Sequence, residues 1–97
     1  MSTNAYDYES ITVADTAIGF TAAKLKPSST DTPKAAICTL ETGQIRFRTD
    51  GSDPTSAEGH LLKIGQQLIV ESFDSMKGFR AIRTGATSGV LKVTYET

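Results

Sequence analysis

The chain has 97 residues, 38% of them hydrophobic, and its ten basic and eleven acidic residues nearly balance. A chain of this length typically forms one domain, and on folding it buries about 65% of the surface that the unfolded chain exposes. The near-neutral charge excludes strong electrostatic attraction to nucleic acids or anionic membranes, so we expect neither as a partner. No apolar run reaches the ~20 residues of a membrane span, and the N-terminus lacks the basic and apolar regions of a signal peptide.

Cys38 is the only cysteine, which excludes an internal disulfide and a cysteine-based metal cluster. Reduced, intracellular synthesis is the simplest interpretation of this composition. The residue lies in an apolar run without a basic neighbour that would activate its thiol. We therefore expect Cys38 to be a small buried hydrophobic residue rather than a nucleophile.

The first nine residues are polar and show no hydrophobic periodicity. This pattern predicts an extended N-terminal arm over 1–9, followed by a single domain over 10–97. Tyr6 and Tyr8 share one face of an extended arm, because side chains alternate along a strand. In an assembly we expect these two tyrosines to anchor the arm on a neighbouring subunit, whereas in an isolated monomer we expect a frayed tail.

Short strands and polar turns follow the arm. Two apolar residues in phase predict a first strand over 10–14. The segment 17–25 is rich in alanine, but Gly19 in its middle and its β-branched residues favour a strand over a helix. Residues 26–33 are polar and include two prolines, so we expect the longest loop of the chain there.

The segment 45–55 combines an alternating strand with a sharp turn. Ile45 and Phe47 face one way and two arginines face the other, as a sheet with one buried face requires. The strand stops at a turn in which Gly51 can adopt a positive φ and Pro54 removes a backbone donor. We expect the remaining strands to lie against this one.

The segment 35–41 is apolar on both faces, which predicts a central strand. Only a short turn at Thr42 and Gly43 separates it from the strand that begins at Ile45. Two strands joined by so few residues are expected to pair as a hairpin.

The second half of the chain continues the pattern, with strands expected over 61–64, 67–71, 78–83 and 90–96. A polar loop over 72–77 is expected to contain one helical turn, and Leu91, Val93 and Tyr95 are expected to face the core. About eight short strands separated by regular turn signals predict an all-β fold. We expect an antiparallel β-sandwich, immunoglobulin-like or jelly-roll-like, with the extended N-terminal arm.

The turn with Asp50, Asp53 and nearby Glu58 has the carboxylates that a calcium site would need, because hard cations bind clustered carboxylates. The loop lacks the ligand spacing and the bidentate glutamate of an EF-hand. Aspartate and glycine are ordinary residues at a hairpin end, so we predict turn chemistry and no metal site.

His60 is the only histidine, and a catalytic triad would need it beside a nucleophile and a carboxylate. Nothing in the sequence places these groups together, and the Gly-x-Ser-x-Gly motif is missing. We therefore expect His60 at the surface or on a strand edge, predict no catalytic or cofactor-binding residues, and expect that the protein is not an enzyme.

Arginines occur in two strands of similar character, Arg46 and Arg48 in one and Arg80 and Arg83 in the other. If the strands are neighbours, the four guanidinium groups form a patch on one outer face. One interpretation is a solvated face balanced by acidic residues. The other is a protein contact, because arginine makes forked hydrogen bonds to carboxylates and is enriched at interfaces.

Two resemblances bear on the fold and the function. The stretch Ile-Arg-Phe-Arg-Thr-Asp-Gly-Ser-Asp-Pro-Thr over 45–55 looks like the strand and turn of the immunoglobulin-like domain appended to chitobiases and other bacterial glycosidases. This likeness implies a sandwich fold. A carbohydrate-binding accessory module is therefore an alternative, although the chain has no tryptophan for a sugar platform.

A longer series of segments resembles small all-β virion proteins of tailed bacteriophages: 11–13, 36–41, 45–51, 78–83 and 89–95. The resemblance implies a structural role on the particle, most simply a capsid decoration (cement) protein that binds and stabilises the head shell. A small head–tail connector or tail component is the alternative position. No functional residue is carried over from this family.

The hypothesis from the sequence is therefore a virion protein, assembled in the host bacterial cytoplasm, that acts by adhesion. Its expected partners are the major capsid protein or other virion proteins, and further copies of itself as a homo-oligomer on the particle. The expected interface residues are Tyr6, Tyr8, Arg46, Arg48, Arg80 and Arg83. Strand addition at exposed edges is a means by which such subunits assemble.

Overall fold

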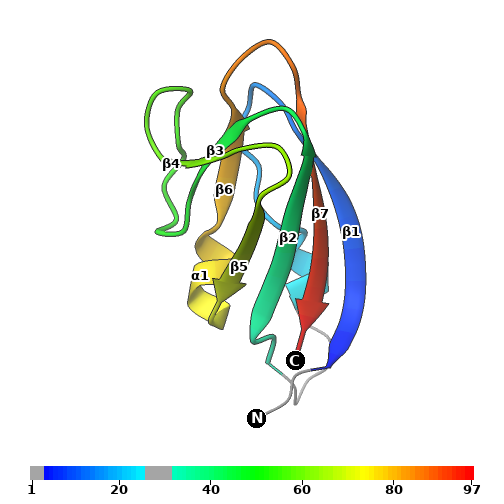
Figure 1. Ribbon diagram of the computed structural model, residues 1–97. Coiled ribbons are helices and arrows are strands. Elements are labelled where there is room, and N and C mark those ends of the chain that lie inside the picture. The colour runs from blue at the N-terminus through cyan, green and yellow to red at the C-terminus, as the bar shows by residue number, and fades with distance from the viewer. Residues whose placement is uncertain (1–3, 26–31) are drawn as a thin grey trace.

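The computed structural model describes residues 4–25 and 32–97, which form two antiparallel β-sheets packed face to face (Figure 1). The elements of this part are, in chain order, β1 (Ala5–Val13), the 3₁₀ helix η1 (Ala22–Leu25), β2 (Ala35–Thr42), β3 (Ile45–Arg48), β4 (His60–Leu62), β5 (Gln67–Glu71), the α-helix α1 (Phe73–Gly78), β6 (Arg80–Arg83) and β7 (Gly89–Glu96). The predicted all-β sandwich is confirmed, with seven strands in the described residues instead of about eight.

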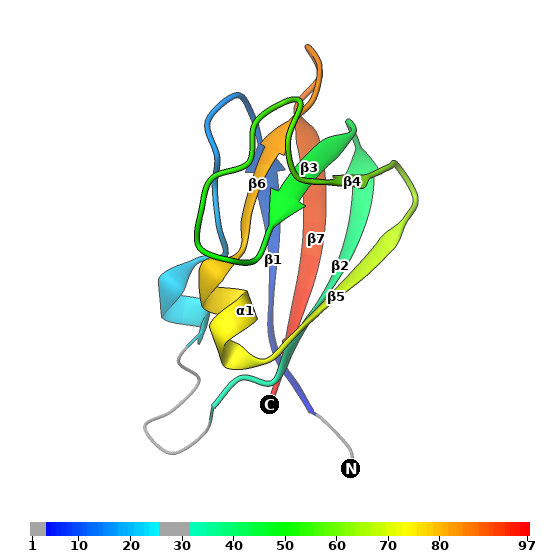
Figure 2. The ribbon, with the colours of Figure 1, turned by 90° about the vertical axis from the view of Figure 1, so that its left-hand side faces the viewer.

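The larger sheet has the strand order β1-β7-β2-β5 and the smaller sheet the order β4-β3-β6. The smaller sheet lies to the left of the larger one in Figure 1 and in front of it in Figure 2. The helix α1 lies below β6 and packs against η1, β5 and β2. Because β2 lies between β7 and β5, the prediction of a central strand there is confirmed.

The core lies between the sheets, and inward-facing residues of β2 and β7 form its centre. Leu91, Val93 and Tyr95 alternate along β7 and are all fully buried, as predicted. Cys38 of β2 is paired in register with Val93 and is fully buried too. Its predicted role as a small core residue is confirmed.

Aromatic rings join the two sheets across this core. Phe79, directly before β6, stacks on Phe20 with the ring centroids 4.3 Å apart. Phe20 also meets Tyr95 of β7 edge-on at 5.6 Å, and Phe47 of β3 lies 5.9 Å from Phe79. Stacked and edge-to-face rings at these distances attract each other beyond their hydrophobic burial, so the cluster ties the smaller sheet to the larger one.

The strand predicted over 17–25 is wrong. Ile18 makes only an isolated bridge to Ala81, and the segment then turns into η1. The alanines and the lysine of η1 favour helical backbone, and this single turn brings Leu25 into the core.

The hairpin predicted between β2 and β3 is also wrong, because the two strands belong to different sheets. Both edges of β2 are occupied by β5 and β7, which leaves no edge for β3. Gly43, with a φ of 68°, turns the chain from one sheet into the other. A Cβ at this glycine would lie 2.6 Å from the carbonyl oxygen of Ser88, so a larger residue does not fit.

The first strand begins at Ala5 instead of at residue 10, and this corrects the predicted N-terminal arm. Residues 5–9 pair with the end of β7 in the same chain. Asn4 and Thr97 extend the ladder by exchanging two backbone hydrogen bonds of 3.1 and 2.9 Å. The rest of the predicted arm, residues 1–3, lies outside the described residues, as does most of the predicted loop, 26–31.

Candidate interaction surface

A β-bulge separates the two tyrosines that the alternation places on one face. Ala5 pairs with Glu96 and Asp7 with Tyr95, so Tyr6 is an extra residue in β1. Its ring turns toward the core, and its hydroxyl donates a hydrogen bond to the carbonyl oxygen of Lys24. Tyr8 points outward and is 53% exposed. Only Tyr8 therefore has the exposure of an interface residue.

The acidic side chains of β1 bind within the chain. Asp7 accepts hydrogen bonds from the Tyr8 backbone N–H and from Lys24, and these two contacts hold its pKa below the ordinary value. Glu9 accepts hydrogen bonds from the hydroxyls of Thr21 and Tyr95. Burial, followed by the Glu9 carboxylate, raises the pKa of Tyr95.

The structure brings three of the four predicted arginines to the outer face of the smaller sheet. β3 pairs with β6 so that Arg48 lies opposite Arg80 and Arg46 lies opposite Ile82. Arg83 lies opposite the fully buried Ile45 and therefore points to the other face. The predicted proximity of the two strands is confirmed, but Arg83 is not part of the patch.

Each arginine of this patch is already bound within the chain. Arg46 donates to the carbonyl oxygens of Ser56 and Gly59, at 3.1 and 2.9 Å, and thereby holds the loop between β3 and β4. Arg48 forks onto Asp50, with an Nε–Oδ1 distance of 3.0 Å, and this hydrogen bond lowers the pKa of Asp50.

The other two arginines also have partners within the chain. Arg80 donates to the backbone carbonyl oxygens of Lys77 and Phe79 at the end of α1, whereas Arg83 donates to the side-chain hydroxyl of Ser88. The three arginines of the patch, like Arg83 on the other face, are therefore partly satisfied donors rather than free cations.

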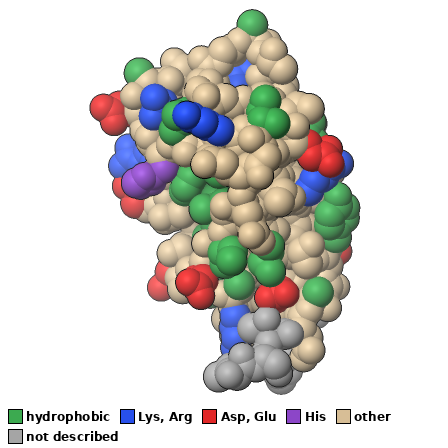
Figure 3. Space-filling view, in the orientation of Figure 1, with side chains coloured by type: hydrophobic (Ala, Val, Ile, Leu, Met, Phe, Trp, Pro, Cys, Tyr) green, Lys and Arg blue, Asp and Glu red, His purple; other side chains and the backbone are tan. Residues whose placement is uncertain are grey.

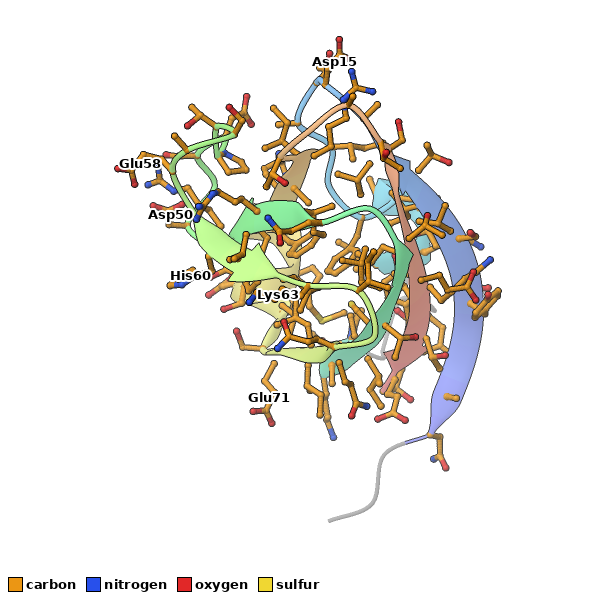
Figure 4. The ribbon with its side chains drawn as sticks, turned by 45° about the horizontal axis from the view of Figure 1, so that its top comes forward. Asp15, Asp50, Glu58, His60, Lys63 and Glu71 are labelled. Atoms are coloured by element: carbon orange, nitrogen blue, oxygen red, sulfur yellow. The ribbon has the colours of Figure 1, made fainter. Side chains whose placement is uncertain are left out.

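A hollow of about 400 Å³ lies beside the patch, lined by Arg48, Thr49, Asp50, Glu58, Gly59 and His60. Figure 4 shows Asp50, Glu58 and His60 on this side of the smaller sheet. His60 is exposed at the start of the edge strand β4, so its predicted position is confirmed. Among the described residues, no group of three or more His, Cys, Asp and Glu side chains is placed to hold a metal ion.

A second hollow, which the sequence did not predict, lies between β5 and the smaller sheet. This groove of about 300 Å³ is lined by Phe47, Thr49, His60, Leu68, Ile69, Val70, Glu71 and Ser75. Figure 3 shows hydrophobic side chains gathered there, below the histidine. The available signal was the run Leu68-Ile69-Val70, which makes β5 apolar on both faces although it is an edge strand.

Five large apolar side chains are exposed in the described residues: Tyr8, Ile18, Leu61, Ile64 and Ile69. Tyr8 lies on β1, Leu61 on β4 and Ile69 on β5, and each of these strands ends its sheet. Exposed apolar groups on an unpaired edge are typical of protein contacts. We define these three edges as the candidate interaction surface.

Comparison of the chain with protein-family models, with curated proteins and with solved structures gave no match. None of the helices in the described ranges has the length and hydrophobicity needed to cross a membrane. Function therefore has to be inferred from the geometry of this surface and from the residues themselves.

Proposed function

We propose that this protein is a non-enzymatic structural subunit of a bacteriophage particle, most simply a capsid decoration (cement) protein that binds and stabilises the head shell. The observation that carries the proposal is the position of three exposed apolar side chains, Tyr8, Leu61 and Ile69, on the edge strands β1, β4 and β5. The choice of a phage particle follows from the sequence resemblance. A head–tail connector or tail component would use the same kind of surface at a different place.

A shell offers such a surface many equivalent binding positions. Each contact buries a few apolar side chains, for which about 25 cal/mol per Å² is the usual gain, and is weak alone. When a copy touches both the shell and a neighbouring copy, the first contact raises the effective concentration of the second binding site, so the two weak contacts together bind tightly. A small protein with exposed apolar side chains on two or three edge strands can contact the shell and neighbouring copies at the same time.

A carbohydrate-binding module is less well supported, because such modules present aromatic rings to the sugar. Of the seven aromatic residues of the chain, all of them in the described residues, only Tyr8 is largely exposed. The other six are buried or half-buried, and four of them belong to the cluster between the sheets. A single exposed tyrosine does not make a sugar platform.

The test is quantitative mass spectrometry of purified particles of the phage that encodes the chain, with the major capsid protein as the internal reference. A copy number comparable with that of the capsid protein supports shell decoration. A copy number that matches a single ring of subunits supports a position at the neck or tail. Absence from the particles overturns the proposal, and a glycan array is then the next experiment.

Binding of the purified protein to particles that lack it tests the arginine patch separately. The forked pair of Arg48 and Asp50 is exposed, so an acidic group on the shell can compete for the guanidinium. Arg48→Gln is expected to slow association and to reduce its dependence on salt. Lys92→Gln is the matched control, because Lys92 is a cation on the larger sheet. Equal effects of both variants would show a general charge effect and exclude a role of the patch.

A further inference from the structure

The exposed side chains of β1 and β4 are available for contacts, but among the described strands the backbone edges of β1, β4 and β6 carry features that oppose strand pairing with another chain. Backbone hydrogen bonds between Ile18 and Ala81 cover the outer edge of β6. The other edge of that sheet, β4, has only three residues. β1 has a bulge at its start, between Ala5 and Asp7, and Glu9 of β1 accepts hydrogen bonds from the backbone N–H and the hydroxyl of Thr21. Short strands, bulges and covering segments are devices by which proteins prevent edge-to-edge association.

β5 has none of these protections. Its five residues pair with β2 without a shift in register, and they include no proline, lysine or arginine. In the described part of the chain, no strand lies on its outer side. The middle residue, Ile69, is 52% exposed on the outer face of the sheet.

The hydrogen bonds at the two ends of β5 show which of its residues direct their backbone N–H and C=O groups toward β2. The N–H of Ser72 binds the carbonyl oxygen of Lys34 at 3.0 Å, and the N–H of Leu40 binds that of Gln66 at 3.2 Å. Backbone groups alternate in direction along an antiparallel strand, so the even-numbered residues of β5 face β2. The odd-numbered residues, Gln67, Ile69 and Glu71, therefore direct both their N–H and their C=O groups to the outer edge.

The geometry points to a second copy of this chain as the occupant of that edge, with the two β5 strands antiparallel about a twofold axis at Ile69. In this register Ile69 lies opposite Ile69 of the second copy, and Gln67 lies opposite Glu71. All three outward residues of each strand then donate and accept across the axis, which no other register achieves. The two four-stranded sheets become one continuous sheet, the isologous contact typical of homodimers.

The side chains of β5 are complementary to themselves in this register. Two exposed isoleucines meet at the axis, and apolar side chains directly opposite each other on neighbouring strands stabilise a sheet. The amide of Gln67 meets the Glu71 carboxylate of the second copy, so no like charges lie opposite each other.

The groove beside β5 gains a wall from the second copy. Leu68 and Val70 point to the inner side of the strand and line the groove together with Phe47. In the proposed register Leu68 lies opposite Val70 of the second copy, in a non-hydrogen-bonded pair whose side chains approach closely. This inference goes beyond the proposed function, because it rests on the strand edge alone and applies whether or not the protein belongs to a particle.

Sedimentation equilibrium of the full chain over a wide concentration range tests the pairing. The wild-type protein is expected to form dimers, and Ile69→Lys, which brings two ammonium groups together at the axis, is expected to weaken dimerisation at least tenfold. Tyr8→Lys is the matched control, because Tyr8 is equally exposed on the opposite edge strand of the same sheet. Thermal melts of both variants establish that they fold.

Substitutions at Gln67 test the register. Gln67→Lys places a cation opposite Glu71 of the second copy and is expected to tighten the dimer, whereas Gln67→Glu is expected to weaken it. Within one copy these two positions are four residues apart on an extended strand, so the change has little effect on the monomer. Equal affinities for the two variants would overturn this register.

An Ile69→Cys variant supplies an independent readout. Cα atoms of a hydrogen-bonded antiparallel pair lie about 5.5 Å apart, within the range of a disulfide, and the buried Cys38 does not compete. Oxidation is expected to give a covalent dimer. The proposal is overturned if the wild type stays monomeric at millimolar concentration and the cross-link also fails. It is overturned as well if the wild type dimerises but Ile69→Lys does not weaken the dimer. A wild-type monomer whose binding to particles is lost in Ile69→Lys overturns it as well, since β5 would then bind a different protein.

Discussion

The environment of Cys38 predicts how the stability of the protein changes at alkaline pH. Burial raises the pKa of its thiol from 9.0 to about 12. Above about pH 9 the unfolded chain releases this proton while the folded chain keeps it, so the free energy of unfolding falls as the pH rises. This one group lowers it by about 1.4 kcal/mol between about pH 8 and pH 10.

Urea unfolding of the wild type and of Cys38→Ala over this pH range measures the effect. The variant is expected to be less stable at every pH, because it leaves a small cavity, but to show a flatter dependence on pH. Subtracting the pH dependence of the variant's free energy of unfolding from that of the wild type removes the contribution of all other titrating groups. Parallel slopes would contradict the assignment to Cys38.

Two glycines with the same backbone requirement differ in their surroundings. Gly43 and Gly51 have φ values of 68° and 87°, so alanine at either position adds roughly 1–2 kcal/mol of left-handed strain. A Cβ at Gly51 meets nothing within 4 Å, whereas at Gly43 it meets the backbone of Ser88 at 2.6 Å. We expect Gly51→Ala to destabilise the protein by about 1 kcal/mol and Gly43→Ala by about 3 kcal/mol. Chemical denaturation of both variants measures the difference. Equal losses in the free energy of unfolding would show that a small local movement relieves the clash between residue 43 and the backbone of Ser88.

At the scale of single side chains, alternation along a strand predicted most inward-facing residues correctly but failed at Tyr6. The burial of Leu91, Val93 and Tyr95 follows from a period of two, which the sequence displays directly. The bulge at Tyr6 depends on how β1 pairs with a strand more than 80 residues away, and no local pattern records that pairing. The separation of Tyr6 from Tyr8 was therefore not predictable from the sequence.

At the scale of elements, the position of a strand along the chain was easier to predict than its sheet. The bounds of β2, β5 and β7 agree closely with the hydrophobic pattern. The false hairpin arose because a short turn between β2 and β3 indicates only that the strands are consecutive. Which strands occupy the edges of β2 is decided by β5 and β7, which come later in the chain. The run Leu68-Ile69-Val70 indicates an apolar strand, but for the same reason it does not show that this strand ends its sheet and lines a groove.

Arg46 orders a loop of its own chain. Its guanidinium donates hydrogen bonds to the carbonyl oxygens of Ser56 and Gly59 in the loop between β3 and β4. Arg46→Met removes both hydrogen bonds and keeps much of the apolar length of the side chain. We expect faster amide hydrogen exchange in residues 55–59 and a loss of about 1 kcal/mol in global stability.

Arg48→Met is the control for this prediction. Arg48 pairs with Asp50 at the surface and makes no hydrogen bond to the 55–59 loop, and exposed ion pairs contribute little to stability, so we expect no change in hydrogen exchange of that loop. If Arg46→Met left the exchange of the loop unchanged, its two hydrogen bonds would not be what orders the loop.

At the scale of the whole molecule, the two sheets depend on one shared core. The sequence predicted a sandwich because its apolar residues alternate in strands too short to be stable alone. It did not reveal that the irregular segment before η1 contributes Phe20 to the contact between the sheets. That ring stacks on Phe79 beside the smaller sheet and meets Tyr95 of the larger one. Loss of the contact in either sheet therefore weakens both.

Phe79→Ala tests this dependence. Phe79 is 1% exposed and contacts the rings of Phe20 and Phe47, so its truncation leaves a cavity between the sheets and is expected to cost about 3–5 kcal/mol. Phe73→Ala, at a half-buried ring of α1, is the control and is expected to cost about 1 kcal/mol. Because the sheets share the core, thermal unfolding of Phe79→Ala is expected to remain a single transition when followed by backbone circular dichroism and by tyrosine fluorescence. Two separated transitions would show that each sheet retains structure without the other, and the aromatic cluster would then not be what couples them.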